Sequence, residues 1–373
     1  MSAKKTQVKV IKQNVGVDIS KDDFKVCFYH LDSNGKKFIK GTRTFKNTLT
    51  GFVAFMKWIE KKRITELTVR ITIEATGVYY ENLVHFLNDN ETDNSYYLSV
   101  VLPTQSKAYG KSLNLKTKTD KVDAKMLGQF GIERDLMKWQ SGSPIMLTLK
   151  QLTRDRENLL DEKTAISNKL HALNHSFNPN KTVMKRMKQR LNLIKKQVKQ
   201  AEKQIKQTIS QDEVLKLKIE NITKLKGLGL ITVATVVAET NGFTLFTSRS
   251  QLISYSGYDV VESESGTSVK GKTRISKKGN KHIRRVLHFP AITAVKHEPE
   301  FKQLFDRVLG RSFIKMKAYV AVQRKLLVII YTLYKYDCAY DPDYQKNMHE
   351  DMLKSQEQNI KNCRQETNPA YSG

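Results

Sequence analysis

The order of the β-rich and helical segments in the first third of the chain constrains the fold more than any other feature. Three β-rich runs lie within residues 8–46, and the turn Asp32-Ser-Asn-Gly separates the second from the third. A segment with helical spacing follows over residues 49–62, and strand and helix then alternate twice up to residue 130. Three strands joined by turns and followed by β-α units predict a mixed sheet with helices on its faces.

Acidic residues end two of these strands and begin one of the helices. Asp18 and Glu74 each close an apolar strand, and two aspartates three residues apart share one face at a helix start. Carboxylates gathered in this way repel one another unless a cation lies among them, and Mg²⁺ prefers such oxygen ligands. Two ions could activate a nucleophile and stabilise a leaving oxygen at a phosphodiester. The predicted Mg²⁺ site consists of Asp18, Glu74, Asp120 and Asp123.

Some of these acids have a simpler explanation. Asp120 could cap its helix and Asp123 could complement the helix dipole, while Asp18 could belong to a strand-ending turn. Glu74 has no comparable capping role. The four acids together favour a metal site. The element order around them is that of the ribonuclease H-like α/β fold, which we predict for residues 8–140.

A different pattern begins after residue 144. Apolar positions three and four residues apart run from Ile145 to Leu173 and again from Met187 to Ile205, with the turn Phe177-Asn-Pro-Asn between them. This pattern predicts an antiparallel helical hairpin or coiled coil over residues 145–222. Between residues 181 and 206 there are ten Lys or Arg residues and one acid. Charge of one sign favours contact with nucleic acid over an ordinary solvated face.

Residues 223–340 are predicted to form a third, mostly helical unit. Gly227 and Gly229 join two helical stretches, which predicts a helix-hairpin-helix element that brings a helix N-terminus close to a phosphate. A plain tight turn explains these two glycines equally well. Residues 341–373 are polar with few core candidates, so we expect a loose helix or a disordered tail.

The charge of the chain indicates a polyanionic partner. Lys and Arg number 65 against 37 Asp and Glu, which gives a formal net charge of +28. Lys-rich coding could raise the charge everywhere, but it does not explain the concentration in two segments. No apolar run reaches the ~18 residues of a membrane span, and we expect no secretory leader because the first residues lack an apolar stretch. The three cysteines are far apart, so we expect neither a zinc site nor a disulfide framework, and a cytoplasmic location fits.

A second basic segment covers residues 270–285 and contains no acid. Its cations, all candidates for binding nucleic acid, are Lys270, Lys272, Arg274, Lys277, Lys278, Lys281, Arg284 and Arg285. The run Ser263-Glu-Ser-Gly lies just before it. A serine hydroxyl is a poor nucleophile without a base, a metal or an arginine to assist it. From the residues alone, this run is a loop.

Seven motifs, in consistent order from about residue 14 to residue 335, resemble the DEDD transposases of bacterial insertion sequences. The N-terminal motifs are Val15-Gly-Val-Asp-Ile-Ser-Lys, Ile73-Glu-Ala-Thr-Gly-Val-Tyr and Lys118-Thr-Asp-Lys-Val-Asp-Ala-Lys-Met-Leu. The C-terminal motifs are Leu225-Lys-Gly-Leu-Gly, Tyr255-Ser-Gly-Tyr, Glu264-Ser-Gly and Gly271-Lys-Thr-Arg-Ile-Ser-Lys-Lys-Gly-Asn. The proline that usually follows the second C-terminal motif is missing, since the chain reads Tyr258-Asp-Val-Val.

The resemblance implies a RuvC-like N-terminal domain, a coiled coil and a C-terminal transposase domain. It implies that the four acids bind Mg²⁺, that Lys118 contacts nucleic acid, and that Ser265 joins covalently to a DNA phosphate, with Ser263 as the nearby alternative. It also implies a homo-oligomer, a dimer or tetramer, in which the metal site of one subunit completes the serine site of another. The implied partners are donor DNA, target DNA and a structured bridge RNA.

The leading hypothesis is therefore an RNA-guided DNA recombinase of an insertion sequence, which acts through a phosphoserine link in the bacterial cytoplasm at the nucleoid. Such a link conserves the energy of the phosphodiester bond, which agrees with the absence of a phosphate-binding Gly-x-x-x-x-Gly-Lys-Ser/Thr loop. The alternative is a hydrolytic RuvC-like junction resolvase that uses only the acids and water. A third hypothesis, a non-catalytic binding protein, is disfavoured by the four intact acids.

Overall fold

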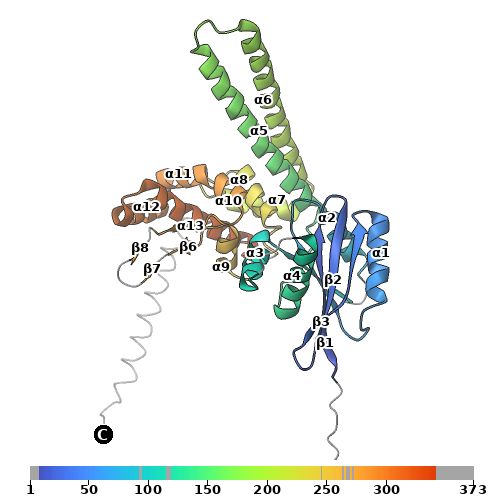
Figure 1. Ribbon diagram of the computed structural model, residues 1–373. Coiled ribbons are helices and arrows are strands. Elements are labelled where there is room, and N and C mark those ends of the chain that lie inside the picture. The colour runs from blue at the N-terminus through green and yellow to red at the C-terminus, as the bar shows by residue number, and fades with distance from the viewer. Residues whose placement is uncertain are drawn as a thin grey trace, which may run out of the picture. The chain divides into compact units, whose positions relative to one another are not determined.

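The computed structural model describes residues 8–91, 95–114, 119–244, 246–262, 264–265, 269–270 and 273–341. The chain divides into two compact units, Met1–Ser141 and Gly142–Gly373. The first combines a sheet with helices, and the second is mostly helical (Figure 1). The predicted tail lies outside the described residues, apart from its first position. No helix in the described part of the chain has the length and apolar character that a membrane crossing requires.

Unit 1 is a mixed five-stranded sheet with helices, as predicted. Its strands are β1 Val10–Ile19, β2 Asp23–Asp32, β3 Lys37–Lys46, β4 Val69–Glu74 and β5 Tyr96–Val101. They lie in the order β3-β2-β1-β4-β5, with β2 antiparallel to both neighbours and β1, β4 and β5 parallel. Its helices are α1 Leu49–Glu60, α2 Glu81–Asp89, α3 Pro103–Ser112 and α4 Asp120–Glu133.

The side chains of β1 alternate between two differently covered faces, because successive residues of a strand point to opposite sides. Val15 and Val17 belong to the apolar core that includes Phe55 and Ile59 of α1. Asn14, in contrast, donates a hydrogen bond to the carbonyl of Gly128 in α4 at 2.7 Å. Asp18 has the same parity as Asn14, so the strand directs it toward the α4 side of the sheet.

Gly16 of β1 and Gly128 of α4 allow the helix to approach the strand closely. A Cβ atom added to Gly16 would lie 2.0 Å from the backbone nitrogen of Gly128 and 2.2 Å from the carbonyl oxygen of Ala124. Backbone atoms of a helix cannot yield to such a clash as a flexible side chain would. Any side chain at residue 16 would therefore push α4 away from the strand that carries Asp18.

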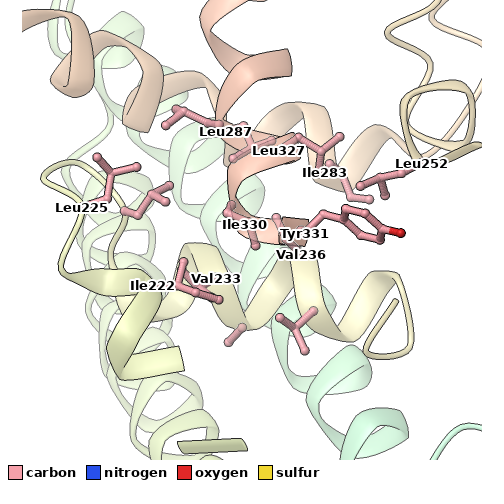
Figure 2. Packing of buried hydrophobic residues seen from close by; sticks show 14 of the residues in the cluster. Ile222, Leu225, Val233, Val236, Leu252, Ile283, Leu287, Leu327, Ile330 and Tyr331 are labelled. Atoms are coloured by element: carbon pink, nitrogen blue, oxygen red, sulfur yellow. The ribbon is translucent and has the colours of Figure 1, made fainter. Parts of the chain in front are cut away.

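Unit 2 is built mainly of helices around one apolar core. The helices are α5 Pro144–Asn174, α6 Lys181–Ser210, α7 Glu213–Thr223, α8 Leu230–Glu239, α9 Arg249–Tyr255, α10 Lys281–Val286, α11 His288–His297, α12 Pro299–Ser312 and α13 Lys315–Tyr336. Ile222, Val233, Leu287 and Leu327 meet in the core, although they come from four different parts of the unit (Figure 2). Because these contacts join segments far apart in sequence, burial holds α7, α8 and α13 together.

The two longest helices, α5 and α6, lie side by side and antiparallel (Figure 1). Asn180 caps α6, since its side-chain oxygen accepts hydrogen bonds from the backbone of Thr182 and Val183. The hairpin was predicted to extend to residue 222, but α6 ends at Ser210. Asp212 then starts α7 by accepting a hydrogen bond from Leu215 N at 3.0 Å. The sequence pattern continued through this break because α7 is also amphipathic. Coiled-coil packing of the seam stays a prediction.

Four short strands connect α9 to α10. They are β6 Val260–Val261, β7 Glu264–Ser265, β8 Val269–Lys270 and β9 Arg274–Ile275. β6 pairs with β9 and β7 with β8, both antiparallel. We call the described residues between 259 and 276 the serine ribbon, because they include Ser265.

Candidate functional site

Asp18 and Glu74 lie at the same edge of the unit 1 sheet. β1 and β4 are parallel, and the last paired positions are Val17 and Ile73. Each acid is the next residue along its strand, so both stand where the carboxyl ends of neighbouring parallel strands meet. This edge is the usual place for a ligand in a sheet with parallel strands. The pairing register of β1 and β4 therefore brings these two predicted acids next to each other.

Asp120 and Asp123 occupy the first turn of α4, on the helix that covers this side of β1. The hydroxyl of Thr119 caps the helix by accepting a hydrogen bond from Val122 N at 3.4 Å. The alternative that Asp120 is itself the capping residue is wrong, because Thr119 has that role. The helix N-terminus still favours both negative charges.

The four acids act on one another electrostatically. The pKa of Asp18 rises from 3.8 to about 6, first because the carboxyl group is partly buried and then because Asp123, Asp120 and Glu74 repel its charge. A carboxyl group surrounded by others in this way is a common feature of functional sites. The other three predicted acids thus lie within electrostatic reach of Asp18.

Three residues that the sequence did not single out contact two of these acids. Lys25, the Cα partner of Asp18 across β1 and β2, is bound to the carboxylate of Asp120. This contact lowers the pKa of Asp120. Glu74 accepts hydrogen bonds from Ser106 and, at 2.9 Å, from Thr76. Lys25 and Asp120 are 95 residues apart, so no local pattern could have indicated their contact. The alternation of side chains along β2 could have indicated only which face of the sheet Lys25 occupies.

Metal binding at the four acids stays a prediction. Within the described residues, no three Asp, Glu, His or Cys side chains approach closely enough to hold one ion. In this arrangement Lys25 engages Asp120, and the hydroxyl groups of Ser106 and Thr76 engage Glu74. The donor set still fits a hard divalent cation, because it consists of carboxylates whose mutual repulsion a cation would relieve. A metal ion at Asp120 would either share this carboxylate with Lys25 or displace the lysine.

The serine ribbon begins and ends at a narrow backbone contact in unit 2. Ser276 N donates to the carbonyl of Asp259 at 2.8 Å, and Lys277 N donates to that of Gly257 at 3.1 Å. A Cβ atom added to Gly279 would lie 2.4 Å from Tyr255 O and 2.6 Å from Gly257 N. Both ends of the ribbon are therefore fixed to each other, and Ser265 lies between them on β7, opposite Val269.

Some cations of the second basic segment are exposed, whereas others have partners inside unit 2. Arg274, Lys277, Lys278 and Lys281 are exposed, and Lys118 and Lys272 lie outside the described residues. Arg284 instead donates to the carbonyl of Ser256 at 2.8 Å. Arg285 binds Glu157 at 2.9 Å and Asp161 at 2.7 Å, both in α5. These two arginines serve contacts inside unit 2, which the local charge pattern could not indicate. The backbone of Lys270 pairs with that of Glu264.

The two glycines of the predicted helix-hairpin-helix element differ from each other. Gly227 has a φ of 105°, and an added Cβ would lie 3.0 Å from Pro290 O and 3.2 Å from Ala294 N, both in α11. Its close approach is therefore to the protein's own helix. Gly229 is the N-cap residue of α8 and has nothing within 4 Å of such a Cβ. Of the two, only Gly229 leaves space for a phosphate at the helix N-terminus.

A buried acid supports the base of the serine ribbon. The side chain of Glu239 is 0% exposed and accepts hydrogen bonds from Arg154 at 2.6 and 2.9 Å. It also accepts one from Asn280 at 2.7 Å, and Asn280 caps α10 directly after the ribbon. Burial alone would raise the pKa of Glu239, but the hydrogen bonds and charge of Arg154 lower it below its ordinary value.

Replacing Arg154 with methionine should lower the free energy of unfolding by about 3 kcal/mol at pH 8, because Glu239 would remain buried without its cation. A lowered pKa stabilises the fold above the ordinary pKa of the carboxyl group, and this contribution is lost as the pH falls through the lowered value. In the variant, burial raises the pKa of Glu239, so the deficit should shrink toward pH 4. Urea unfolding followed by circular dichroism measures both values.

Arg156→Met is the matched control for this experiment. Arg156 also lies on α5, but it pairs with the part-exposed Glu202 of α6. A partly solvated pair contributes up to about 1 kcal/mol. Equal losses in the two variants would contradict the role assigned to the buried acid.

Two family models match the chain. A transposase model of the DEDD group of IS110 covers residues 15–179, and a model of the transposase IS116/IS110/IS902 family covers residues 219–306. The pilin gene-inverting protein of Moraxella lacunata is 29% identical over 344 residues, which are 91% of this chain and 99% of that protein. Its counterpart in Moraxella bovis is 28% identical over the same shares.

Two further similarities are more limited. An insertion element IS110 protein of Streptomyces coelicolor is 22% identical over 120 residues, which are 32% of this chain and 29% of that protein. The solved structure of the fowlpox virus resolvase with Holliday junction DNA is similar over 32% of this chain and 97% of that chain, with 14% identity and a TM-score of 0.25. That structural likeness is too weak to carry any conclusion.

The family models match both the unit that carries the four acids and the unit that carries the serine ribbon. This chain is accordingly a DNA transposase or recombinase. It belongs to the IS110 family of transposases, as the motifs of both halves had indicated.

Proposed function

We propose that this chain cuts and rejoins DNA strands through a covalent link between Ser265 and a DNA phosphate, assisted by Mg²⁺ at the four acids of unit 1. The observation that carries the proposal is the raised pKa of Asp18. Its pKa is raised to about 6 because the group is partly buried at the edge of the sheet and repelled by three other acids. Such a cluster costs stability, and a cation bound there together with a phosphate offsets the cost.

The acids and their partners have distinct roles in this proposal. Asp18, Glu74, Asp120 and Asp123 would hold one or two Mg²⁺ ions, which supply Lewis-acid stabilisation of the reacting phosphate. Ser106 and Thr76 orient the carboxylate of Glu74. Lys25 neutralises Asp120 until a metal replaces it. The RuvC-like character of the unit is part of this proposal, and the mixed sheet with parallel strands at the acid edge supports it.

Ser265 would act as the nucleophile. Its hydroxyl oxygen bonds to phosphorus, a deoxyribose oxygen leaves with a proton, and the phosphodiester is retained as a phosphoserine ester. A second DNA hydroxyl reverses the step on a new strand, so no nucleotide hydrolysis is needed. The narrow backbone contact at the base of the serine ribbon supports this assignment, because a nucleophile requires a fixed position.

The proposed partners are donor DNA, target DNA and a structured bridge RNA, and the proposed assembly is a dimer or tetramer. The one-sign charge of α6 and the net charge of +28 support a nucleic-acid partner. The family resemblance supports the guide RNA and the oligomer. Exposed Arg274, Lys277, Lys278 and Lys281 are the residues that we expect to contact phosphates beside the ribbon.

Trapping a covalent protein–DNA species tests the proposal. The full chain is incubated with its element DNA, its flanking noncoding RNA and Mg²⁺, and the reaction is stopped with SDS. We expect a protein band that carries DNA and withstands boiling. Nuclease digestion and peptide mass spectrometry should then locate a nucleotide on Ser265.

The same experiment separates the alternatives. A nucleotide on Ser263 would move the nucleophile by two residues. DNA cut with free ends and without any covalent species would identify a hydrolytic, resolvase-like enzyme and refute the serine mechanism. A reaction that proceeds equally well in EDTA would refute the role of the four acids.

A further inference from the structure

An exposed aromatic side chain stands between α12 and α13, in a backbone conformation that phenylalanine rarely adopts. Phe313 is 86% exposed, and its φ of 54° and ψ of 15° place it in the left-handed region at the end of α12. Helices usually place glycine at such a position, because a Cβ atom makes this conformation unfavourable. Phe313 therefore costs stability through its backbone, and its exposed ring gains almost no burial energy to offset that cost.

A second phenylalanine of the same unit shows what normally compensates for this strain. Phe243 has a φ of 61°, but it is only 4% exposed. Its ring packs against those of Tyr331 and Tyr334, each with a centroid distance of 5.4 Å. Phe313 has no ring contact among the described residues. Packing thus explains Phe243 and does not explain Phe313.

Hydrogen bonds hold the Phe313 backbone in place. Phe313 N donates to the carbonyl of Leu309 at 2.7 Å. The hydroxyl of Ser312 donates to the carbonyl of Val308 at 2.9 Å and accepts from Ile314 N at 3.3 Å. The ring is consequently presented from a defined turn between α12 and α13. An observed strain of this kind at an exposed side chain indicates a functional constraint.

The surroundings of the ring are cationic and apolar. Arg311, Lys315 and Lys317 are exposed, and none of them has an ion pair within the described residues. Ile314 and Met316 are 49% and 54% exposed. After Asp306 the sequence contains no acid until Asp337. We call residues 311–317 the Phe313 turn.

We propose that the Phe313 turn binds an unpaired DNA strand, with a base stacked on Phe313 and the neighbouring phosphates at Arg311, Lys315 and Lys317. An aromatic face next to a one-sign cationic surface is the combination that binds single strands without sequence preference. A protein partner fits less well, because the centres of protein interfaces are depleted in charge. Duplex DNA hides the faces of its bases. The inference rests on the proposed function only in that strand exchange exposes unpaired DNA.

Binding to short oligonucleotides tests this surface without requiring recombination. The full chain is titrated into labelled oligo(dT) and into a labelled duplex at one salt concentration, and fluorescence anisotropy is recorded. Phe313→Ala should weaken oligo(dT) binding by about tenfold. Binding to the duplex should change by less than about twofold. Phe313→Trp should restore the affinity for oligo(dT), because it restores the stacking face.

Phe313→Gly separates binding from stability. It should lose the same affinity for oligo(dT) while its melting temperature rises by about 2 °C or more, because glycine relieves the left-handed strain. Tyr336→Ala is the matched control. Tyr336 is 66% exposed at the other end of α13, but it precedes the acid Asp337. This control should bind oligo(dT) as the unchanged chain does.

Three outcomes would overturn the proposal. Phe313→Ala could bind oligo(dT) as tightly as the unchanged chain does, or it could lose affinity for the duplex equally. In a parallel titration with labelled oligo(U), a loss of affinity for oligo(U) without a loss for oligo(dT) would assign the turn to RNA binding. None of these results bears on the covalent link at Ser265, so the two proposals fail separately.

Discussion

Ser265→Ala is expected to abolish strand joining and the covalent protein–DNA species. Removing a nucleophile that has no substitute costs on the order of 10⁴-fold or more in rate. Binding of DNA should persist, because β7 pairs with β8 through backbone atoms that alanine retains. Gel electrophoresis of the joined strands, together with a filter-binding measurement on the same variant, separates chemistry from binding.

Ser263→Ala is the control for this substitution, since it removes the other hydroxyl group of the same motif. It should join strands at a rate within about threefold of the unchanged chain, as expected for a residue outside the chemical step. Undiminished strand joining by Ser265→Ala would contradict the serine mechanism. Loss of joining with retained Mg²⁺-dependent cutting would show that water replaces the serine at the acids.

The sheet of unit 1 could be predicted because the sequence signals of its strands and turns are local. Each strand carries its own alternation, and the short turns between the first three runs leave antiparallel pairing as the simplest arrangement. The meeting of Asp18 and Glu74 followed from the same reasoning, since parallel strands align their ends. Their approach to α4 depends on Gly16 and Gly128, which are 112 positions apart. No local pattern reveals such a contact.

The surroundings of the charged residues could not be predicted for a related reason. A run of cations gives the sign of the local charge but not the identity of its partners. Arg285 is bound to Asp161, 124 residues away, and Asp120 is bound to Lys25, 95 residues away. The basic segment therefore contains both internal ion pairs and exposed cations, and only the fold distinguishes them. The break between α6 and α7 was missed because both helices are amphipathic.

Asp18→Asn is expected to gain stability while it loses DNA cleavage. The variant keeps the shape of the side chain but removes a charge that Asp123, Asp120 and Glu74 repel. Loss of a metal ligand that stabilises the reacting phosphate by several kcal/mol should lower the cleavage rate by about 10³-fold. In metal-free buffer at pH 8, the melting temperature should rise by on the order of 5 °C.

The pH dependence of this gain has a definite sign. The folded pKa of about 6 exceeds the ordinary 3.8, so the folded chain binds more protons than the unfolded chain between these values. Stability of the unchanged chain therefore falls as the pH rises through that window and stays lower above it. Asp18→Asn lacks this titration, so its advantage should vanish near pH 4. Asp22→Asn, which removes an exposed acid nearby, should show no such advantage at either pH.

Added Mg²⁺ should reverse the order of the two melting temperatures. The ion stabilises only the chain whose folded state binds it, so the unchanged chain should gain stability and Asp18→Asn should not. Both tryptophans, Trp58 and Trp139, lie in unit 1, so their fluorescence reports the unfolding of the unit that holds the acids. An equal response of both chains to Mg²⁺ would mean that the ion binds elsewhere. The repulsion around Asp18 would then lower the stability of the fold, and no metal at this edge of the sheet would relieve it.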